Sequence, residues 1–490
     1  MTIKAFPTAY GFGVDNNIGG RGGPSVAVTN TNDSGVGSLR AALQATGSRH
    51  IIPRVGGIVA LESNIVIADP YFSYHGQVAP GGGLLVKNYN VQISTHDGIV
   101  RFLRSFPGDG ALGGGRNTNA FLVSGGSGQK YNITADHCSV GFSTDQNFDA
   151  SGHWNDITYQ WCLIAEPRAT GGGPTDNPSY SGSLFYANPY QGQMSLSLHH
   201  CVYACNKQRN PLCGPYLSSG GGIYGAPGMR VDMRNCLIYN WLGNNYTTFA
   251  TNHANATNYN NWLAASGGNP GIEANVVGCR WVRGPSSVLG DPGGIWVYPH
   301  VKLFAANNMG PGNSGTPTNG FNPLVNHLTR RYVGEANQSK LYGTYDPTPF
   351  IQLTEFPFPF VPTHDATDIF ALLTQQAGCI LPSKDTLWAR IMNDVVNNTG
   401  TLADHNDYPT LAAGTALTAS QPDLIPDAWK VAHGLNAATD YTGVQAPSGY
   451  DWVEVWANEV AGDGFSEDSA FFGRSRRAQV FVPGNFLLIH

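Results

Sequence analysis

Three carboxylates lie within a fourteen-residue stretch of this chain, at Asp136, Asp145 and Asp149. Only 12% of the 490 residues are charged, so the grouping stands out from its surroundings. Carboxylates held close together repel one another unless a cation lies between them, and a set of oxygen ligands suits a hard ion such as Ca²⁺. The stretch is therefore a candidate cation site. The alternative is a solvated loop that carries scattered acids.

The composition limits which partners are expected. The net charge is −6 and no basic block occurs, so neither nucleic acid nor an anionic membrane is an expected partner. No apolar run approaches the roughly 18–20 residues that span a bilayer. The first seven residues lack the apolar core of a signal peptide. We expect an extracellular protein. It would reach the outside of the cell by means of a signal that has been removed, or by another route, for example as part of a virion.

Short apolar strands dominate residues 50–305, and Gly, Asn or Asp separates each strand from the next. No helical pattern of about ten residues intervenes, which argues against a parallel α/β fold. A chain of 490 residues exceeds the size of one ordinary core, but a solenoid lengthens its core instead of thickening it. The pattern predicts an all-β fold, a parallel β-helix.

Five cysteines recur in one local context, at the same offset before a short apolar segment, which indicates the same place in successive repeats. They are Cys138, Cys162, Cys201, Cys236 and Cys279. Their variable spacing is typical of successive coils with loops of different length. No Cys/His set has the spacing of a zinc finger. We interpret the five thiols as a structural ladder of small apolar side chains inside the coil.

The two ends of the chain differ from this repeat. Ser38 is a plausible N-cap for a short helix that would close the first coil. Helical patterns return at 365–373, 384–396, 426–434 and 450–460. We therefore divide the chain into a β-helix domain with its cap (1–320), a C-terminal extended and helical region that packs on it (321–463), and a tail (464–490).

Several motifs together resemble the pectate lyases of polysaccharide lyase family 1, from Ala5 to about Ala461. The segments that carry the resemblance are 5–13, 20–23, 35–40, 76–83, 100–109, 136–149, 161–166, 199–200, 209–211, 234–241 and 426–436. The family implies a right-handed parallel β-helix with Ca²⁺ and an acidic polysaccharide in a groove on one face. It implies cleavage of galacturonan by β-elimination.

The resemblance also implies roles for individual residues. The Ca²⁺ ligands would be Asp136, Asp145 and Asp149, with a further ligand at Glu166. Arg209 heads an Arg-x-Pro motif and matches the catalytic base. His137, His199 and His200 match structural positions of the motif, and His200 is also a candidate substrate contact.

The sequence departs from the family where the substrate is gripped. The lysine expected some twenty residues after Asp149 is absent, and Arg168 is the candidate substitute. A second arginine expected just after Arg209 is also absent, and Lys207 is the candidate source of that charge. The reaction class is therefore better defined than the specificity.

Three functions remain open from the sequence. The first is a Ca²⁺-dependent lyase of pectate or a related uronan, expected to be monomeric. The second is a virion tailspike or tail-associated glycan binder, expected to be trimeric. The third is a hydrolase on the same fold, which would need two carboxylates about 5–10 Å apart acting as acid and base.

Overall fold

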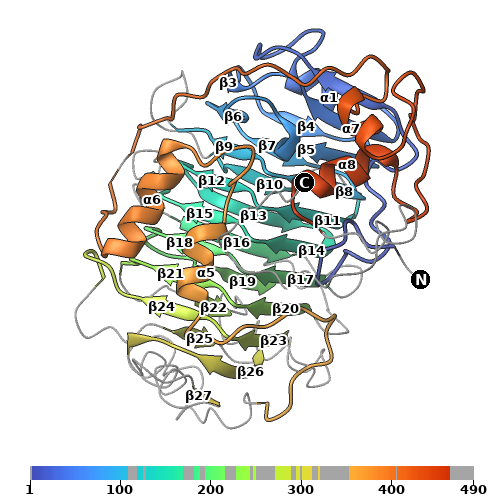
Figure 1. Cartoon of the computed structure of the whole chain (residues 1–490). Coiled ribbons are helices and arrows are strands. Elements are labelled where there is room, and N and C mark those ends of the chain that lie inside the picture. Colours follow the sequence, from blue (N-terminus) through green and yellow to red (C-terminus); the bar gives the residue numbers. More distant parts are fainter. Residues whose placement is uncertain are drawn as a thin grey trace, which may run out of the picture.

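The computed structural model describes residues 3–108, 118–124, 128–168, 181–187, 194–215, 228–242, 247–249, 271–287, 294–297, 301–311, 318–319, 352–403 and 405–463. Three stacked sheets form the body of the molecule (Figure 1). Within these residues every pairing between strands is parallel except that of the last two strands of the longest sheet. The predicted parallel β-helix is confirmed.

The three sheets take one strand each from successive coils. Sheet 1 has the strands β1 (Ser25–Val28), β2 (Arg49–Pro53), β5 (Phe72–His75), β8 (Gly98–Arg101), β11 (Lys130–Asp136), β14 (Trp154–Gln160), β17 (Met194–His199), β20 (Met229–Arg234), β23 (Ile272–Val277), β26 (Val301–Asn308) and β27 (Thr318–Asn319). Sheet 2 has β3 (Gly57–Ala60), β6 (Leu84–Lys87), β9 (Arg104–Phe106), β12 (Ser139–Gly141), β15 (Leu163–Ala165), β18 (Val202–Ala204), β21 (Leu237–Tyr239) and β24 (Arg280–Val282). Sheet 3 has β4 (Ile65–Ile67), β7 (Val91–Ile93), β10 (Phe121–Val123), β13 (Gln146–Gly152), β16 (Ser181–Ala187), β19 (Leu212–Pro215), β22 (Thr247–Phe249) and β25 (Ile295–Val297).

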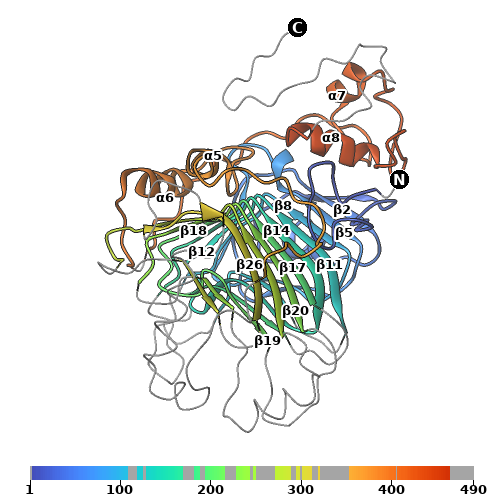
Figure 2. The same ribbon diagram turned by 90° about the horizontal axis from the view of Figure 1, so that it is seen from below.

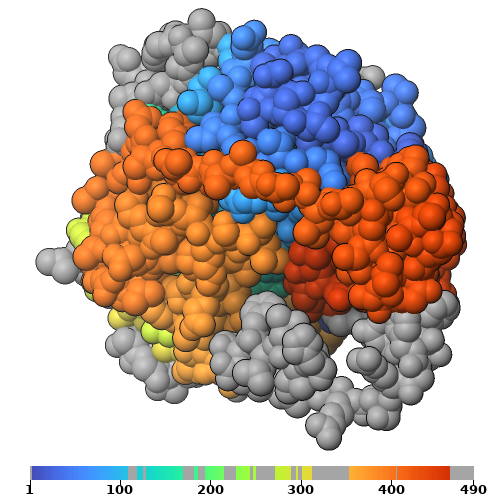
Figure 3. Space-filling model, turned by 45° about the horizontal axis from the view of Figure 1, so that its top comes forward, coloured from blue at the N-terminus to red at the C-terminus, as the bar shows by residue number. Residues whose placement is uncertain are grey.

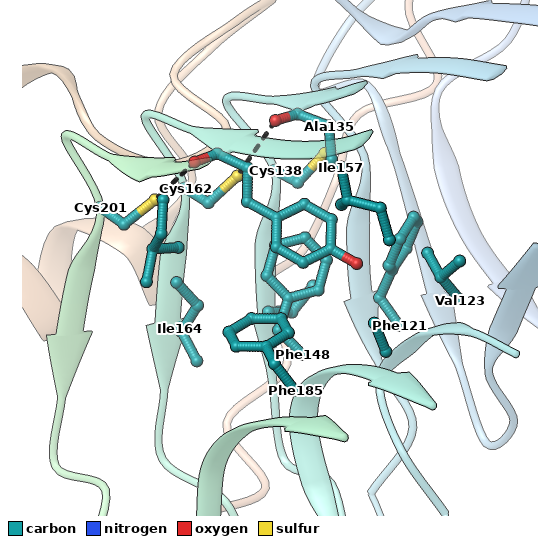
Figure 4. Packing of buried hydrophobic residues seen from close by; sticks show 14 of the residues in the cluster. Phe121, Val123, Ala135, Cys138, Phe148, Ile157, Cys162, Ile164, Phe185 and Cys201 are labelled. Atoms are coloured by element: carbon teal, nitrogen blue, oxygen red, sulfur yellow. Dashed lines mark hydrogen bonds between the residues drawn. The ribbon is translucent and has the colours of Figure 1, made fainter. Parts of the chain in front are cut away.

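The inward-facing side chains of all three sheets form one core along the stack. On sheet 3, Phe121 and Phe148 meet edge to face with ring centroids 5.0 Å apart, and Phe148 stacks on Tyr159 of sheet 1 at 3.9 Å. The five repeated cysteines are fully buried and reduced. Figure 4 shows Cys138, Cys162 and Cys201 in a row beside these rings. The predicted thiol ladder is confirmed.

Each of several turns from sheet 1 to sheet 2 contains one residue in the left-handed backbone conformation. Phe102, His137, Trp161, His200 and Asn235 have φ between 49° and 56°. The rings of the first four stack on one another, because each residue occupies the same place in its coil. The rings of His137 and Trp161 are nearly parallel with centroids 5.7 Å apart, and Trp161 stacks on His200 at 4.3 Å.

Helices cap and cover the stack. Helix α1 (Leu39–Leu43) begins at Ser38, whose hydroxyl accepts a hydrogen bond from the Ala41 amide, as the sequence predicted. Its leucines enter the end of the main core, and η1 (Gly76–Val78) is a short 3₁₀ turn after β5.

The C-terminal region packs on sheets 1 and 2. Its helices are α5 (Ile369–Gln376), α6 (Thr386–Asn397), α7 (Asp427–Ala432) and α8 (Trp452–Val460). Helices α5 and α6 cover apolar side chains of sheet 2, and α8 lies over Ile52 of β2. Figure 2 shows the helices on the side of the stack opposite the sheet 3 strand β19, and Figure 3 shows the C-terminal segment lying against the first coils.

The proposed boundary at 320/321 and the tail from 464 lie outside the described residues. In the described part of the chain, none of the helices combines the length and the apolar character that crossing a bilayer requires.

Candidate functional site

Two of the three clustered aspartates meet on sheet 3. Asp145 directly precedes β13, and Asp149 lies within it, between Phe148 and Ala150, which point into the core. Since side chains alternate along a strand, the Asp149 carboxylate faces the outside of the sheet. Its side chain is nevertheless buried, at 5% exposure. Burial and the nearby Asp145 charge raise the pKa of Asp149 to about 8.

Arg209 lies beside this pair. It is in the turn from sheet 2 to sheet 3, just before β19, with a left-handed φ of 58°, and its carbonyl accepts a hydrogen bond of 2.8 Å from the Ser183 amide of β16. Its positive charge opposes the rise in the pKa of both Asp145 and Asp149. Thus two carboxylates at β13 and one guanidinium just before β19 lie close enough to influence one another across three successive coils of sheet 3.

Sequence reasoning missed Asn119. Its amide Nδ2 donates a 2.8 Å hydrogen bond to Oδ2 of Asp149. The other carboxylate oxygen, Oδ1, is buried and has no hydrogen-bond partner among the described residues. The search for acids passed over an amide, although Asn119 comes two residues before β10, the sheet 3 neighbour of β13. That register is the signal that could have identified it.

Asp136 lies on sheet 1 and not beside Asp145 and Asp149, whereas the expected set of Ca²⁺ ligands included all three residues. It ends β11 in sheet 1, so the chain must pass through β12 of sheet 2 before it reaches β13. Its carboxylate pairs with Arg101 at 2.8 Å and accepts a hydrogen bond from Gln160, also at 2.8 Å. Burial raises its pKa, but the charges of His137 and Arg101 outweigh burial and hold the pKa well below the usual range. This carboxylate is already satisfied within the protein.

Glu166 and Arg168 also have partners, both from the C-terminal region. Glu166 is buried just after β15 and forms a two-pronged ion pair with Arg390 of α6, at 2.8 and 2.6 Å. The guanidinium of Arg168 donates to the backbone oxygen of His405 at 2.6 Å and to the side-chain oxygen of Asn406 at 2.5 Å. The two residues anchor the turn after β15 to the segment that follows α6.

The remaining candidates divide between two sides of the stack. Lys207 is half-buried in the same turn as Arg209, and its backbone oxygen accepts from the Leu242 amide. His200 lies at the turn between sheets 1 and 2, buried under Trp161, with its Nδ1 at 2.9 Å from Nδ1 of His199. Burial and the neighbouring histidines hold the pKa of His200 well below its usual value. Lys207 therefore lies in the turn that leads into sheet 3, the sheet of the aspartate pair, whereas His200 lies at the turn from sheet 1 to sheet 2.

Two further groups have the spacing of metal ligands. They are His50, Asp451 and Glu454, and Glu166, His405 and Asp407. Each contains a glutamate that is already paired with an arginine, Glu454 with Arg21 and Glu166 with Arg390. These groups join the C-terminal helices to the β-helix, and we interpret both as structural ion-pair networks.

No protein-family model matches the chain. Curated relatives match it along nearly its whole length. A protein named probable pectate lyase C from Emericella nidulans is 27% identical over 476 residues, which cover 95% of this chain and 94% of that protein. Another of that name from Aspergillus fumigatus is 28% identical over 465 residues, covering 94% of each. A solved Bacillus subtilis pectate lyase mutant is 13% identical, with a TM-score of 0.42, and covers 72% of this chain and 91% of its own.

The chain therefore combines a parallel β-helix with a sequence that is similar along nearly its whole length to proteins named probable pectate lyase C. This similarity confirms the predicted resemblance to the pectate lyases of polysaccharide lyase family 1.

Proposed function

We propose that this chain cleaves galacturonan or a related uronate polysaccharide by Ca²⁺-dependent β-elimination, outside the cell. The names of the curated relatives support the substrate class. The observation that carries the proposal is the arrangement on sheet 3, where Asp145 and Asp149 lie beside each other and beside Arg209.

The donor set fits a hard cation. Asp149 keeps one buried carboxylate oxygen without a hydrogen-bond partner among the described residues, and burial together with the neighbouring charge of Asp145 raises its pKa. A cation between the two carboxylates would satisfy that oxygen and relieve their repulsion. Asp145 and Asp149 would therefore hold Ca²⁺, which when bound supplies a Lewis acid for the substrate carboxylate. Asn119 orients the Asp149 carboxylate for this role.

Arg209 is the candidate base. It would take the proton from C5 of the uronate. The electron pair of that C–H bond forms the C4–C5 double bond. The C4–O bond then breaks, and the leaving oxygen takes the electron pair of that bond. Arginine is protonated over the accessible pH range, so Arg209 must lose its proton before it can act. Lys207, in the same turn, supplies a positive charge for a uronate carboxylate.

The test is to measure the ultraviolet absorbance of the unsaturated product during incubation with polygalacturonate and Ca²⁺. We expect a rise that a chelator abolishes and that Arg209→Ala removes. The matched control is Arg230→Ala, because Arg230 lies on β20 of sheet 1, its side chain is 41% exposed, and it forms a loose ion pair of 3.8 Å with Glu273. Full turnover by Arg209→Ala would exclude this residue as the base.

A hydrolase is the second candidate, and one observation favours it. A carboxyl group whose pKa is about 8 can serve as a general acid at neutral pH, and Asp145 beside it could act as the partner carboxylate. Hydrolysis would produce reducing ends without the ultraviolet absorbance and would not respond to a chelator. The tailspike alternative is decided by the mass in solution, since it requires a trimer.

A further inference from the structure

Three aromatic rings gather at successive turns from sheet 3 to sheet 1. They are Tyr71, His96 and Tyr131, which come just before β5, near the start of β8 and at the start of β11. The imidazole of His96 lies flat on the Tyr131 ring, with centroids 4.5 Å apart and planes 3° apart. Tyr71 meets His96 edge-on at 5.5 Å. The histidine ring is thus fixed between two phenols.

A carboxylate fixes the same ring from one side. Nδ1 of His96 is 2.7 Å from Oδ2 of Asp97, and Oδ1 of Asp97 accepts a hydrogen bond from Asn132 at 3.1 Å. The Asp97 side chain is 8% exposed, whereas that of His96 is 26% exposed. An Nδ1–H donated to a carboxylate leaves Nε2 to interact elsewhere. No described residue forms a hydrogen bond to that nitrogen.

The ring cluster flanks the candidate site. On the outer face of sheet 3, Asp149 pairs in register with Leu122, and Leu122 pairs with Gln92 of β7. His96 follows β7 after a turn of two residues, so it is two coils from Asp149. At the spacing of neighbouring strands this is about 10 Å along the stack. His96 is also displaced sideways, because it lies four residues beyond Gln92 at the turn to sheet 1. A sugar chain that crosses the outer face of sheet 3 obliquely, toward that turn, would reach both places.

We propose that His96, with the hydroxyl groups of Tyr71 and Tyr131, forms a binding subsite for an acidic sugar unit at a distance from the bond that is cleaved. This inference rests on the proposed function. Nε2 of His96 would bind a carboxylate or hydroxyl of the sugar, and the two phenols would donate further hydrogen bonds. Burial and the charge of Asp97 raise the pKa of Tyr131, which favours the protonated form of its hydroxyl, the form that donates a hydrogen bond.

A purely structural ring stack is the competing interpretation, and the molecule contains one for comparison. His137 also pairs through Nδ1 with an aspartate, Asp136, at 2.8 Å. However, His137 lies between Phe102 and Trp161 at the turn from sheet 1 to sheet 2, away from sheet 3. His137→Gln is therefore a matched control, which removes a similar pair without touching the proposed subsite.

The test compares trigalacturonate with octagalacturonate as substrates of His96→Asn, which keeps a donor to Asp97 but lacks Nε2. We expect KM for the octamer to rise roughly tenfold, the loss of about one hydrogen bond to a charged group, while kcat and the trimer KM stay unchanged. His96→Gln, whose amide reaches the place of Nε2, should restore part of the affinity. The unfolding temperatures of both His96 variants should be equal to or higher than that of the His137→Gln control.

Equal KM values for wild type and His96→Asn with the octamer would overturn the subsite. Binding of octagalacturonate to Arg209→Ala, measured by calorimetry with and without the His96 change, keeps the two proposals separate. If the wild type shows no lyase activity, the proposed function fails. The subsite then stands or falls on whether His96→Asn weakens that binding.

Discussion

Replacing Asp149 by asparagine should stabilise the metal-free protein, because this carboxylate is held where its charge is unfavourable. Its pKa is raised from 3.8 to about 8, mainly by burial and by Asp145. Between these two values the folded state keeps a proton that the unfolded state releases, so the free energy of unfolding falls as the pH rises and is constant above the folded pKa. At 1.36 kcal/mol per unit, the cost is at most about 6 kcal/mol above pH 8.

The assay is denaturant unfolding in chelator at several pH values, for wild type and Asp149→Asn. The difference between the two proteins cancels most other titrating groups. We expect the advantage of the variant to grow by about 3 kcal/mol between about pH 6 and about pH 9, since about two pH units of that range lie below the folded pKa. Ca²⁺ should stabilise the wild type and have little effect on the variant. A pH-independent difference, or a wild type more stable than the variant at high pH without metal, would refute the reasoning.

Three further predictions concern the neighbours of the site. Asp136→Asn should destabilise the protein, because Asp136 has a lowered pKa and contributes stability that is present at neutral pH and lost as the pH falls through its folded pKa. The Ca²⁺ affinity of this variant, measured by calorimetry, should equal that of wild type. Arg390→Met should cost about 3 kcal/mol in urea unfolding, because the buried Glu166 loses its two-pronged ion pair and keeps only the more distant His405 at 3.8 Å among the described residues. Adding Glu166→Gln should recover much of the loss, and additive effects would contradict the pairing. The cysteines of the ladder, with Cys201 as an example, should resist a thiol reagent until the protein unfolds, and fast labelling of the folded protein would contradict their burial.

Much of the fold could be predicted because a solenoid repeats its local rules. Short strands, punctuating turn residues and a cysteine at the same place in five coils are all visible along the chain. Each coil packs on its sequence neighbours, so little depends on distant contacts. The N-cap at Ser38 followed from the same local reasoning, since its hydroxyl meets an amide only three residues away.

The site was less predictable because it depends on contacts between coils and with the C-terminal region. The sequence brought Asp136 into the cluster, but the turn that carries Cys138 sends the chain into sheet 2 and separates Asp136 from Asp149. The position of Cys138 in the ladder held a clue, since it marks where sheet 2 begins. The partners of Glu166 and Arg168 lie more than two hundred residues away, at Arg390 and His405.

The sequence by itself determined the coil, its thiol ladder, its cap and the resemblance to the pectate lyases, because these follow from repeated local patterns and motif order. Only the tertiary structure decided which acids meet. Asp145 and Asp149 share one side of one coil, whereas Asp136 faces Arg101 on another sheet. The physical reason is that each side of a coil is only a few residues long. Acids nine residues apart in sequence can therefore lie on different faces, and Asn119, about thirty residues from Asp149, can be its hydrogen-bond partner.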